Sequence, residues 1–288
     1  MKVSLGTKPM KRAILLAHYD RDGIIDPYVI AAADAYRRFA DTLALISVSI
    51  RVLPTELHGV VDHFVPRDNV GYDFGSWRAG LEAIGALSDF DEIICVNDSV
   101  YGPLFDLAPA ITSPRHREAD FWGMTISAQV RPHVQSWFFA MRPPVIQSET
   151  FRQFWADSAG DLPKDDIIAQ REIGFSAALC DAGYHIAAVH DGRDRPLPSA
   201  AEKKKHCSWF SPLRTRRHLR KTQQKKSPFN PSELFYERLW EAGVPFLKRR
   251  IFTANFYGLD LSRMLADLGR LSPRWADLIA NHRRRVER

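Results

Sequence analysis

The chain has 288 residues, a formal net charge of +6 and 45% hydrophobic residues, so it can bury a substantial core. No apolar run reaches the roughly 18 residues that a membrane-spanning helix needs. The opening residues also lack the apolar stretch of a secretion signal, so we expect a cytoplasmic protein. The cysteines Cys95, Cys180 and Cys207 are far apart, which predicts neither a disulfide framework nor a structural zinc site.

The positive charge is concentrated in residues 201–226, which hold ten Lys or Arg and one acid. The rest of the chain therefore carries about −3, and the net charge describes one segment rather than the whole surface. Basic residues around Trp209 and Phe210 suit an anionic membrane surface. One hypothesis for the whole protein is accordingly a non-enzymatic module that binds anionic lipid or nucleic acid through this segment.

The first part of the chain alternates strand and helix patterns. An apolar run at residues 13–17 predicts a buried strand that ends at His18 and Tyr19. A helix should begin at Asp26-Pro27, with Asp26 as its cap, and its apolar face should run to Ala40. Two more strands are predicted at residues 43–50 and 60–65. This succession indicates an α/β fold with a mainly parallel sheet and right-handed crossovers.

The most informative stretch runs from Arg67 to Leu104. Asp73 is predicted to cap a helix whose apolar residues Trp77, Leu81 and Ile84 share one face. Residues 93–96 form an unalternated apolar run, typical of a strand covered on both faces. This run ends in Asn97-Asp98-Ser99, whose simplest interpretation is a turn, as for the Asn69-Val70-Gly71 tripeptide.

Because parallel strands end at the same edge of a sheet, we expect the polar residues around these strand ends to line one crevice. A helix that starts there also directs free N–H groups at an anion. We interpret the crevice as a site for a nucleoside diphosphate. Its predicted residues are His18, Tyr19, Arg67, Asn69, Gly71, Tyr72, Asp73, Asn97, Asp98 and Ser99.

The second half contributes strands at residues 120–125 and 134–141, whose aromatic residues belong either to a sugar site or, more simply, to the core. A helix at residues 165–182 places Glu172 on its apolar face, where an ionised carboxylate is costly. Glu172 is thus either the partner of a basic side chain or a catalytic base, with Asp165 and Asp166 as the next candidates for the base.

A last strand at residues 185–189 leaves His190 just beyond its end, where the simplest interpretation is a surface histidine. Two closing helices are predicted at residues 261–268 and 275–282. The expected division of the chain is a nucleotide-sugar-binding catalytic domain at residues 1–195, a basic linker or loop at 196–230 and a C-terminal helical extension at 231–288. Neither a G-x-G-x-x-G turn after the first strand nor a P-loop occurs, so the ordinary phosphate-binding motifs are absent.

Several blocks together resemble the rhamnan synthesis protein F family. They are Arg67-Asp68-Asn69-Val70-Gly71-Tyr72-Asp73-Phe74-Gly75-Ser76-Trp77, Val96-Asn97-Asp98-Ser99-Val100-Tyr101-Gly102-Pro103-Leu104, Phe121-Trp122-Gly123-Met124-Thr125, Gln135-Ser136-Trp137-Phe138 and Pro245-Phe246-Leu247-Lys248-Arg249. The resemblance implies a bacterial glycosyltransferase with a GT-A-like, Rossmann-type fold that builds cell-surface polysaccharide or lipopolysaccharide. It also implies a deoxythymidine-diphosphate-rhamnose donor and a glycan or lipid-linked glycan acceptor. For this enzyme we expect no nucleic acid partner, and we expect the basic segment to give peripheral contact with an anionic membrane.

For sugar transfer we expect Asp98 to bind Mg²⁺ or Mn²⁺, with His190 as a second candidate ligand. Asn97-Asp98-Ser99 offers a single carboxylate, which is few protein ligands for a metal ion. Arg67 would share the phosphate charge, while Asn69 and Asp73 orient the donor. Transfer from a β-linked donor to an α-linked product would invert configuration, assisted by Glu172 as the base. The rival enzyme class is a phosphate-ester hydrolase built on Asp98 and His18.

Overall fold

The computed structural model describes residues 10–156, 164–193, 232–234 and 236–287, together with residues 213 and 217. The basic segment at residues 201–226 therefore lies almost wholly outside the described residues. The central element is an eight-stranded sheet in the order β3-β2-β1-β4-β8-β6-β7, with β9 paired to β6. Its strands are β1 (Arg12–His18), β2 (Thr42–Ser47), β3 (His63–Pro66), β4 (Glu92–Asn97), β6 (Phe121–Ser127), β7 (His133–Val134), β8 (Phe138–Met141) and β9 (Ile186–Asp191).

Strand direction divides the sheet. β1 pairs in parallel with β2 and β4, and β2 pairs in parallel with β3. β8 runs antiparallel between β4 and β6, so β6 and its parallel partner β9 point the same way as β1 and β4. Six strands therefore end at one edge of the sheet, and the α/β class with a mainly parallel sheet is confirmed.

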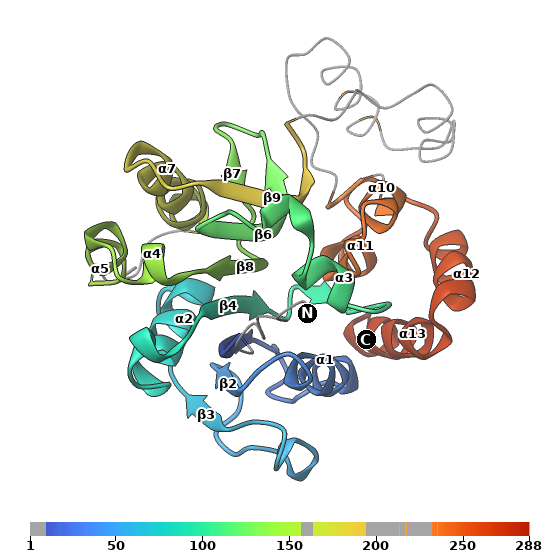
Figure 1. The fold of residues 1–288 in the computed structure, drawn as a ribbon. Helices are drawn as coiled ribbons and strands as arrows, with labels where there is room; N and C mark the ends of the chain where they lie inside the picture. The colour runs from blue at the N-terminus through green and yellow to red at the C-terminus, as the bar shows by residue number, and fades with distance from the viewer. Residues whose placement is uncertain are drawn as a thin grey trace, which may run out of the picture.

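Helices cover both faces of the sheet (Figure 1). One face holds α2 (Tyr72–Ala83), α4 (Pro143–Ile146), α5 (Glu149–Ala156), α6 (Lys164–Ile167) and α7 (Gly174–Asp181), whose apolar side chains pack with Ala13, Leu15 and Ala17 of β1. The other face holds α1 (Pro27–Arg37), α3 (Ala108–Ile111) and the C-terminal helices, which pack with Ile14 and Leu16. Successive side chains of β1 point to opposite faces of the sheet, so this strand contributes to two separate hydrophobic cores.

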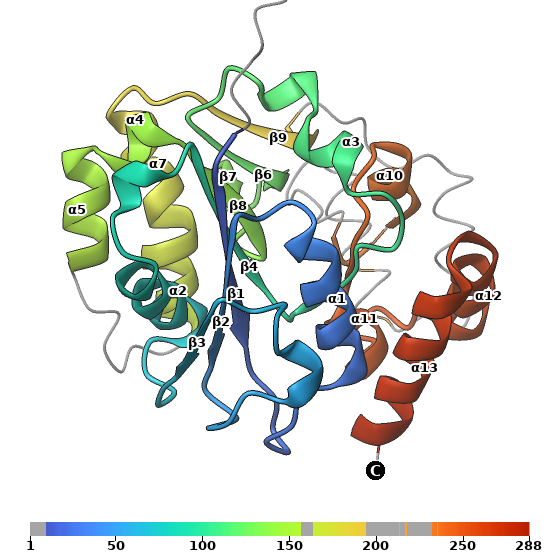
Figure 2. The ribbon, with the colours of Figure 1, turned by 60° about the horizontal axis from the view of Figure 1, so that its bottom comes forward.

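The C-terminal part contains α10 (Tyr236–Glu241), α11 (Arg249–Thr253), α12 (Leu261–Leu271) and α13 (Pro273–Val286). A short β10 (Leu247–Lys248) pairs antiparallel with β5 (Val100–Tyr101), directly after β4. Figure 2 shows that the C-terminal helices lie beside α1 on one side of the sheet. Among the described residues, none of the helices has both the length and the apolar character to cross a bilayer.

Several sequence-based boundaries need correction. The first helix ends at Arg37 rather than reaching Ala40, and the side chain of Asp26 makes no capping hydrogen bond. The strand predicted at residues 134–141 is two strands, β7 and β8, and the residues between them include Gln135, which accepts a 2.7 Å hydrogen bond from Thr125 Oγ1. The two predicted closing helices are confirmed as α12 and α13.

Candidate functional site

The edge where the parallel strands end carries the predicted polar residues. Ala17 of β1 lies opposite Asn97 of β4, so the residues that follow both strands emerge side by side. The backbone N–H of Tyr19 donates to Asp98 Oδ2 at 3.2 Å, and that of Asp98 donates to the carbonyl of Ala17. The chain segments after β1 and β4 are therefore tied directly to each other at this edge.

The start of α2 reaches the same edge. Asn97 Nδ2 donates to Asp73 Oδ2 at 2.7 Å, while Asn97 Oδ1 accepts from the N–H and the hydroxyl of Ser99. The prediction that Asp73 caps the helix is wrong: the N-cap is Gly71, at φ 74°, and no side chain caps this end. Asp73 instead lies in the first turn and joins α2 to β4.

The loop before α2 is folded tightly onto the helix. The Arg67 guanidinium donates to Ser76 Oγ at 3.1 Å and to the carbonyl of Val70. A Cβ on Gly75 would lie 2.2 Å from that same carbonyl, so only glycine allows the close approach. Asn69, in this loop, is exposed. Arg67 therefore shapes the loop, and its contact with phosphate stays a prediction.

Tyr72 opens α2 with φ 51° and leaves 45% of its surface exposed. A positive φ is unusual for a residue with a large side chain and costs about 1–3 kcal/mol. The strain places an exposed aromatic ring next to the uncapped helix start.

Asp98 is buried, and Arg249 Nη1 donates to its Oδ2 at 3.2 Å. Tyr28 links the pair, because its hydroxyl donates to the carbonyl of Asp98 and accepts from Arg249 Nη1 at 2.8 Å. Burial raises the pKa of Asp98 to about 6, and Arg249 opposes that rise. Burial, and then the neighbouring charge of Asp98, likewise raise the pKa of Asp73 to about 6.

Lys248 and Arg249 are site residues that sequence reasoning missed. Lys248 Nζ lies 3.4 Å from Ser99 Oγ and 5.5 Å from the centre of the Trp137 ring. Both cations follow the Pro245-Phe246-Leu247 block, which carried part of the family resemblance. That block was the only signal in the sequence for them, since nearly 150 residues separate it from Ser99.

His18 ends β1 at this edge but is buried, with Nδ1 2.9 Å from Ser47 Oγ. Burial lowers its pKa to about 4, so the ring is neutral at pH 7. His18 thus contributes hydrogen bonding here rather than positive charge.

Glu172 lies in a π-helical turn, Ile168–Ile173, between α6 and α7. Its Oε2 accepts from the N–H of Ser136 at 2.7 Å and from the Ser136 hydroxyl, and its Oε1 lies 3.3 Å from His133 Nε2. Although burial opposes the change, these hydrogen bonds lower the pKa of Glu172, and Glu172 raises the pKa of His133. The basic partner expected for Glu172 is therefore present.

Ser136 lies directly before Trp137, whose carbonyl accepts from the N–H of Asn97 at 3.3 Å. The Glu172 carboxylate is therefore next to the same sheet edge as Asp73 and Asp98. The nearby aromatic residues Phe138, Phe139 and Trp155 are buried, as the simpler interpretation predicted.

His190 does not follow the last strand but lies inside β9, opposite Thr125 and fully buried. β8 and β6 lie between β4 and β9, so His190 is three strand spacings away from β4. At a strand spacing of about 4.8 Å, its backbone is roughly 14 Å from Asn97. His190 and Asp98, the two predicted metal ligands, are therefore far apart.

Mg²⁺ is usually held by one or two carboxylates together with phosphate oxygens and water, so an ion at this site would need the Asp98 carboxylate. One carboxylate oxygen of Asp98 already bonds a guanidinium and an N–H, and Asn97 Oδ1 accepts two hydrogen bonds from Ser99. Within the described ranges, no three His, Cys, Asp or Glu residues are grouped so that they could hold a metal.

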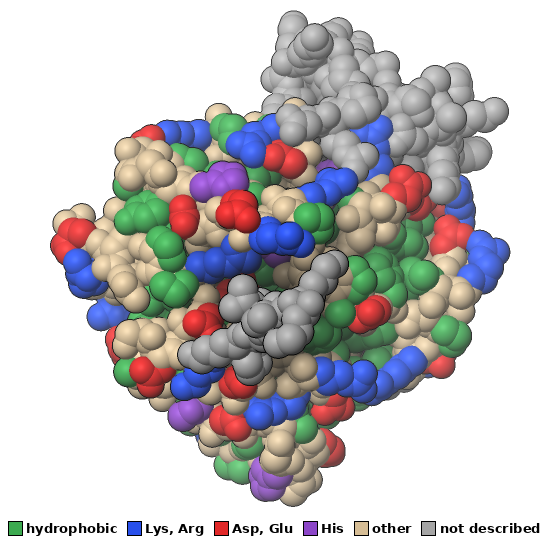
Figure 3. All heavy atoms as spheres, viewed as in Figure 1, with side chains coloured by type: hydrophobic (Ala, Val, Ile, Leu, Met, Phe, Trp, Pro, Cys, Tyr) green, Lys and Arg blue, Asp and Glu red, His purple; other side chains and the backbone are tan. Residues whose placement is uncertain are grey.

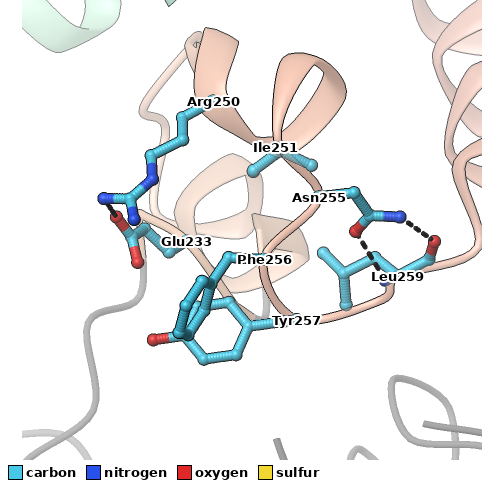
Figure 4. A pocket seen from close by; sticks show the side chains of 7 residues that line it. All are labelled: Glu233, Arg250, Ile251, Asn255, Phe256, Tyr257 and Leu259. Atoms are coloured by element: carbon cyan, nitrogen blue, oxygen red, sulfur yellow. Dashed lines mark hydrogen bonds and ion pairs between the residues drawn. The ribbon is translucent and has the colours of Figure 1, made fainter. Parts of the chain in front are cut away.

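A separate small pocket lies in the C-terminal part (Figure 4). An ion pair at 3.5 Å between Glu233 and Arg250 borders it, and Phe256 and Tyr257 form an apolar wall. Asn255 closes the other side through two hydrogen bonds to Leu259. None of the predicted site residues lines this pocket.

Figure 3 shows the face of the molecule that is turned to the viewer in Figure 1. Over its described part, Lys and Arg side chains are interspersed with Asp and Glu. The excess positive charge found in the sequence lies instead at residues 201–226.

The fold and the polar edge define an α/β protein with a candidate anion site at the ends of parallel strands. The sequence profile described as rhamnan synthesis protein F matches residues 51–213, which is more than half of the chain. The chain therefore belongs to the rhamnan synthesis protein F family.

Similarity to individual proteins is lower. The chain is 27% identical over 210 residues to the virulence protein VirA of Vibrio anguillarum, covering 71% of this chain and 66% of that protein. It thus spans a little under two thirds of the length of this curated relative. An uncharacterised protein of Sinorhizobium fredii is 26% identical over 135 residues, covering 45% of this chain and 35% of its own length.

Two solved structures are also similar. Glucosyl-3-phosphoglycerate synthase from Mycobacterium tuberculosis, in complex with Mn²⁺, uridine-diphosphate-glucose and phosphoglyceric acid, has 10% identity and a TM-score of 0.35, covering 65% of this chain and 73% of its own. The glycosyltransferase GlyE of Streptococcus pneumoniae has 14% identity and a TM-score of 0.32, covering 62% and 45% of the two chains.

Proposed function

We propose that the protein is a glycosyltransferase that moves a sugar from a nucleoside diphosphate onto a cell-surface polysaccharide or lipopolysaccharide precursor. The observation that carries this proposal is the joining of Asp73, Asn97 and Asp98 at the edge where the parallel strands end, in a member of the rhamnan synthesis protein F family. In open α/β sheets this edge is where ligands bind.

The donor's diphosphate is proposed to lie at the uncapped start of α2, where the first N–H groups and the helix dipole favour an anion. Tyr72 offers an exposed ring for the nucleobase, and Asp73 and Asn97 offer hydrogen bonds to ribose or sugar. The loop held by Arg67 adds Asn69 and Gly71 to this wall. His18, Tyr19 and Ser99 complete the proposed donor site.

Glu172 is proposed as the base for the acceptor hydroxyl. Its carboxylate is ionised, 15% exposed and held by Ser136 and His133 near the sheet edge. In a single displacement, the acceptor oxygen bonds to the anomeric carbon as the bond from that carbon to the diphosphate oxygen breaks. The hydroxyl proton passes to Glu172, and the sugar's configuration inverts.

The family name supports L-rhamnose, carried as deoxythymidine-diphosphate-rhamnose, as the proposed donor sugar. A glycan or lipid-linked glycan is the proposed acceptor. The basic segment at residues 201–226 would hold the protein peripherally at an anionic inner membrane surface. This last proposal depends on the sequence alone.

The test is to incubate the purified protein with a panel of nucleotide sugars, with and without glycan acceptors, and to measure release of the nucleoside diphosphate. We expect release that requires an acceptor and falls at least 100-fold in Glu172→Gln. The control Glu149→Gln removes an exposed carboxylate of α5 and should behave as wild type.

Wild-type rates in Glu172→Gln would remove Glu172 from the mechanism. Release of free phosphate without an acceptor would favour the phosphate-ester hydrolase, although a neutral, buried His18 suits that reaction poorly. Failure to bind any nucleotide sugar, together with binding of anionic vesicles that vanishes when residues 201–226 are deleted, would favour the non-enzymatic module.

A further inference from the structure

Two adjacent cations meet the candidate donor site from a distant part of the chain. Lys248 Nζ is 3.4 Å from Ser99 Oγ, and Arg249 Nη1 is 3.2 Å from Asp98 Oδ2. The charge of Lys248 also opposes the rise that burial causes in the pKa of Asp73, so its charge also reaches the carboxylate in the first turn of α2. The two cations therefore lie where a leaving diphosphate would need positive charge.

The backbone holds this pair in a fixed position. Lys248 lies opposite Val100 in the β10-β5 ladder, and the N–H of Arg249 donates to the carbonyl of Ser99 at 2.8 Å. Gly102 lets the segment approach closely, because a Cβ there would lie 2.5 Å from the carbonyl of Pro245. A fixed cation loses little freedom when it binds an anion.

The two side chains have different surroundings. Arg249 is 23% exposed, and Asp98 and Tyr28 both bond its guanidinium. Lys248 is partly exposed and stands over the face of Trp137. Arg249 thus balances the buried Asp98 charge, which would otherwise repel a phosphate, and Lys248 is directed toward the edge.

This arrangement disagrees with a metal-bridged donor site. A divalent ion on Asp98 would have to share that carboxylate with Arg249, at the cost of repulsion between two cations. The neighbouring oxygens are also engaged, because Asn97 Oδ1 accepts from Ser99 and Asp73 Oδ2 accepts from Asn97 Nδ2.

We propose that Lys248 contacts the donor's diphosphate directly and supplies the positive charge that a divalent ion would otherwise bring, while Arg249 acts as a positioning residue that neutralises and orients Asp98. Nucleoside diphosphate binding by this protein is then independent of divalent metal. This inference rests on the proposed function, because it concerns the same donor site.

The experiment is isothermal titration of the full chain with deoxythymidine diphosphate and, separately, uridine diphosphate, in EDTA and in Mn²⁺. For at least one nucleotide, we expect wild-type Kd values in the two conditions to agree within about threefold. In EDTA, Lys248→Ala should weaken binding at least tenfold and Lys248→Arg should restore it to within about threefold. Lys11→Ala removes an exposed lysine just before β1, at the opposite edge of the sheet, and serves as the control.

Binding that falls more than tenfold in EDTA, or Lys248→Ala binding as wild type, would overturn the inference while leaving the proposed function intact. Wild-type protein that binds neither nucleotide in either condition would contradict both. Thermal unfolding of each variant shows that it is folded. The variant Arg249→Lys tests the positioning role of Arg249. That variant should weaken binding without creating metal dependence, and metal-dependent binding in it would count against the role given to Arg249.

Discussion

Arg249 and Asp98 form a 3.2 Å ion pair across 151 positions of the sequence, at the point where β4 ends. Together with the β10-β5 ladder and the contact between Lys248 and Ser99, this pair joins the C-terminal part of the chain to the candidate donor site, and Asp98 is buried. Removing one member of such a pair leaves the other buried and uncompensated, which typically costs about 3–5 kcal/mol.

The acidic pair at this edge predicts a pH-dependent stability change in Asp73→Asn. Burial and the nearby Asp98 charge raise the pKa of Asp73 to about 6, above its value near 3.8 in the unfolded chain. The native state therefore binds more protons between about pH 4 and 6, and wild-type stability falls as the pH rises through that window. Asn cannot ionise, so the variant should be more stable than wild type above pH 6 and equal to it below pH 4.

The increase in the free energy of unfolding that we expect for Asp73→Asn is small. A shift of about two pKa units sets an upper limit of about 3 kcal/mol, and the partial exposure of Asp73 reduces the expected gain to about 1 kcal/mol. Urea unfolding from pH 4 to 8 measures it, with the exposed Asp89→Asn as the control. A gain that grows as the pH falls would contradict the assigned direction.

The loop after β1 depends on one arginine from the last helix. Arg285 of α13 pairs with Asp20, Asp22 and Asp26, and its contact with Asp26 is 3.0 Å. Arg285→Ala should destabilise the protein by about 2–3 kcal/mol, because Asp20 and Asp26 are buried. Arg284→Ala, which removes a hydrogen bond to Asn281, should change stability by less than about 0.5 kcal/mol.

The pH dependence of the Arg285 effect has a definite sign. Although burial opposes it, Arg285 holds the pKa of Asp20 below its ordinary value. This stabilisation is present above the unfolded-state pKa near 3.8 and is lost as the pH falls through the lower native value. The gap between wild type and Arg285→Ala in thermal unfolding should therefore narrow below about pH 4; a gap that stays constant would show that the ion pairs contribute little.

His133 should set the working pH range of Glu172. Its hydrogen bond lowers the pKa of Glu172, so His133→Gln should raise that pKa and move the acidic limb of the pH–rate profile to higher pH. Nucleotide binding should stay within about twofold of wild type, since His133 contacts Glu172, the proposed base, and is not one of the proposed donor-binding residues. An unchanged acidic limb, with a uniformly lower rate, would assign His133 a purely structural role.

Two glycines in helices offer a matched test of the loop that Arg67 holds. Gly75→Ala should destabilise the protein by about 2 kcal/mol or more, because the new Cβ would lie 2.2 Å from the carbonyl of Val70. In Gly269→Ala the nearest atom is 4.0 Å away, so the better helix propensity of alanine should add up to about 1 kcal/mol. Equal effects of the two substitutions in chemical unfolding would contradict the close packing of this loop.

Local sequence patterns predicted the parts of the site that neighbouring residues determine. The apolar run of β4 and the Asn97-Asp98-Ser99 that follows it gave the strand and its polar end, and parallel pairing then placed α2 beside it. The helix cap was misassigned because Asp73 can satisfy either the helix end or Asn97, and only the folded geometry selects Asn97.

The remaining parts depend on contacts between residues distant in sequence. Nothing near Asp98 indicates Arg249, and nothing near Asp26 indicates Arg285, 259 positions away. His190 was placed one step too far because the end of β9 is set by its pairing with β6, not by its own sequence. Sequence periodicity therefore could not predict the ion pairs of Arg249 and Arg285 or the end of β9, because each depends on a contact with a distant segment.

The account depends most on where a nucleoside diphosphate binds. A crystal structure of the protein with deoxythymidine diphosphate in the presence of EDTA tests it directly. We predict phosphate oxygens within hydrogen-bonding distance of Lys248 and the first turn of α2, with the base against Tyr72. Nucleotide bound instead in the pocket between Glu233 and Tyr257, or anywhere away from the end of β4, would contradict the account.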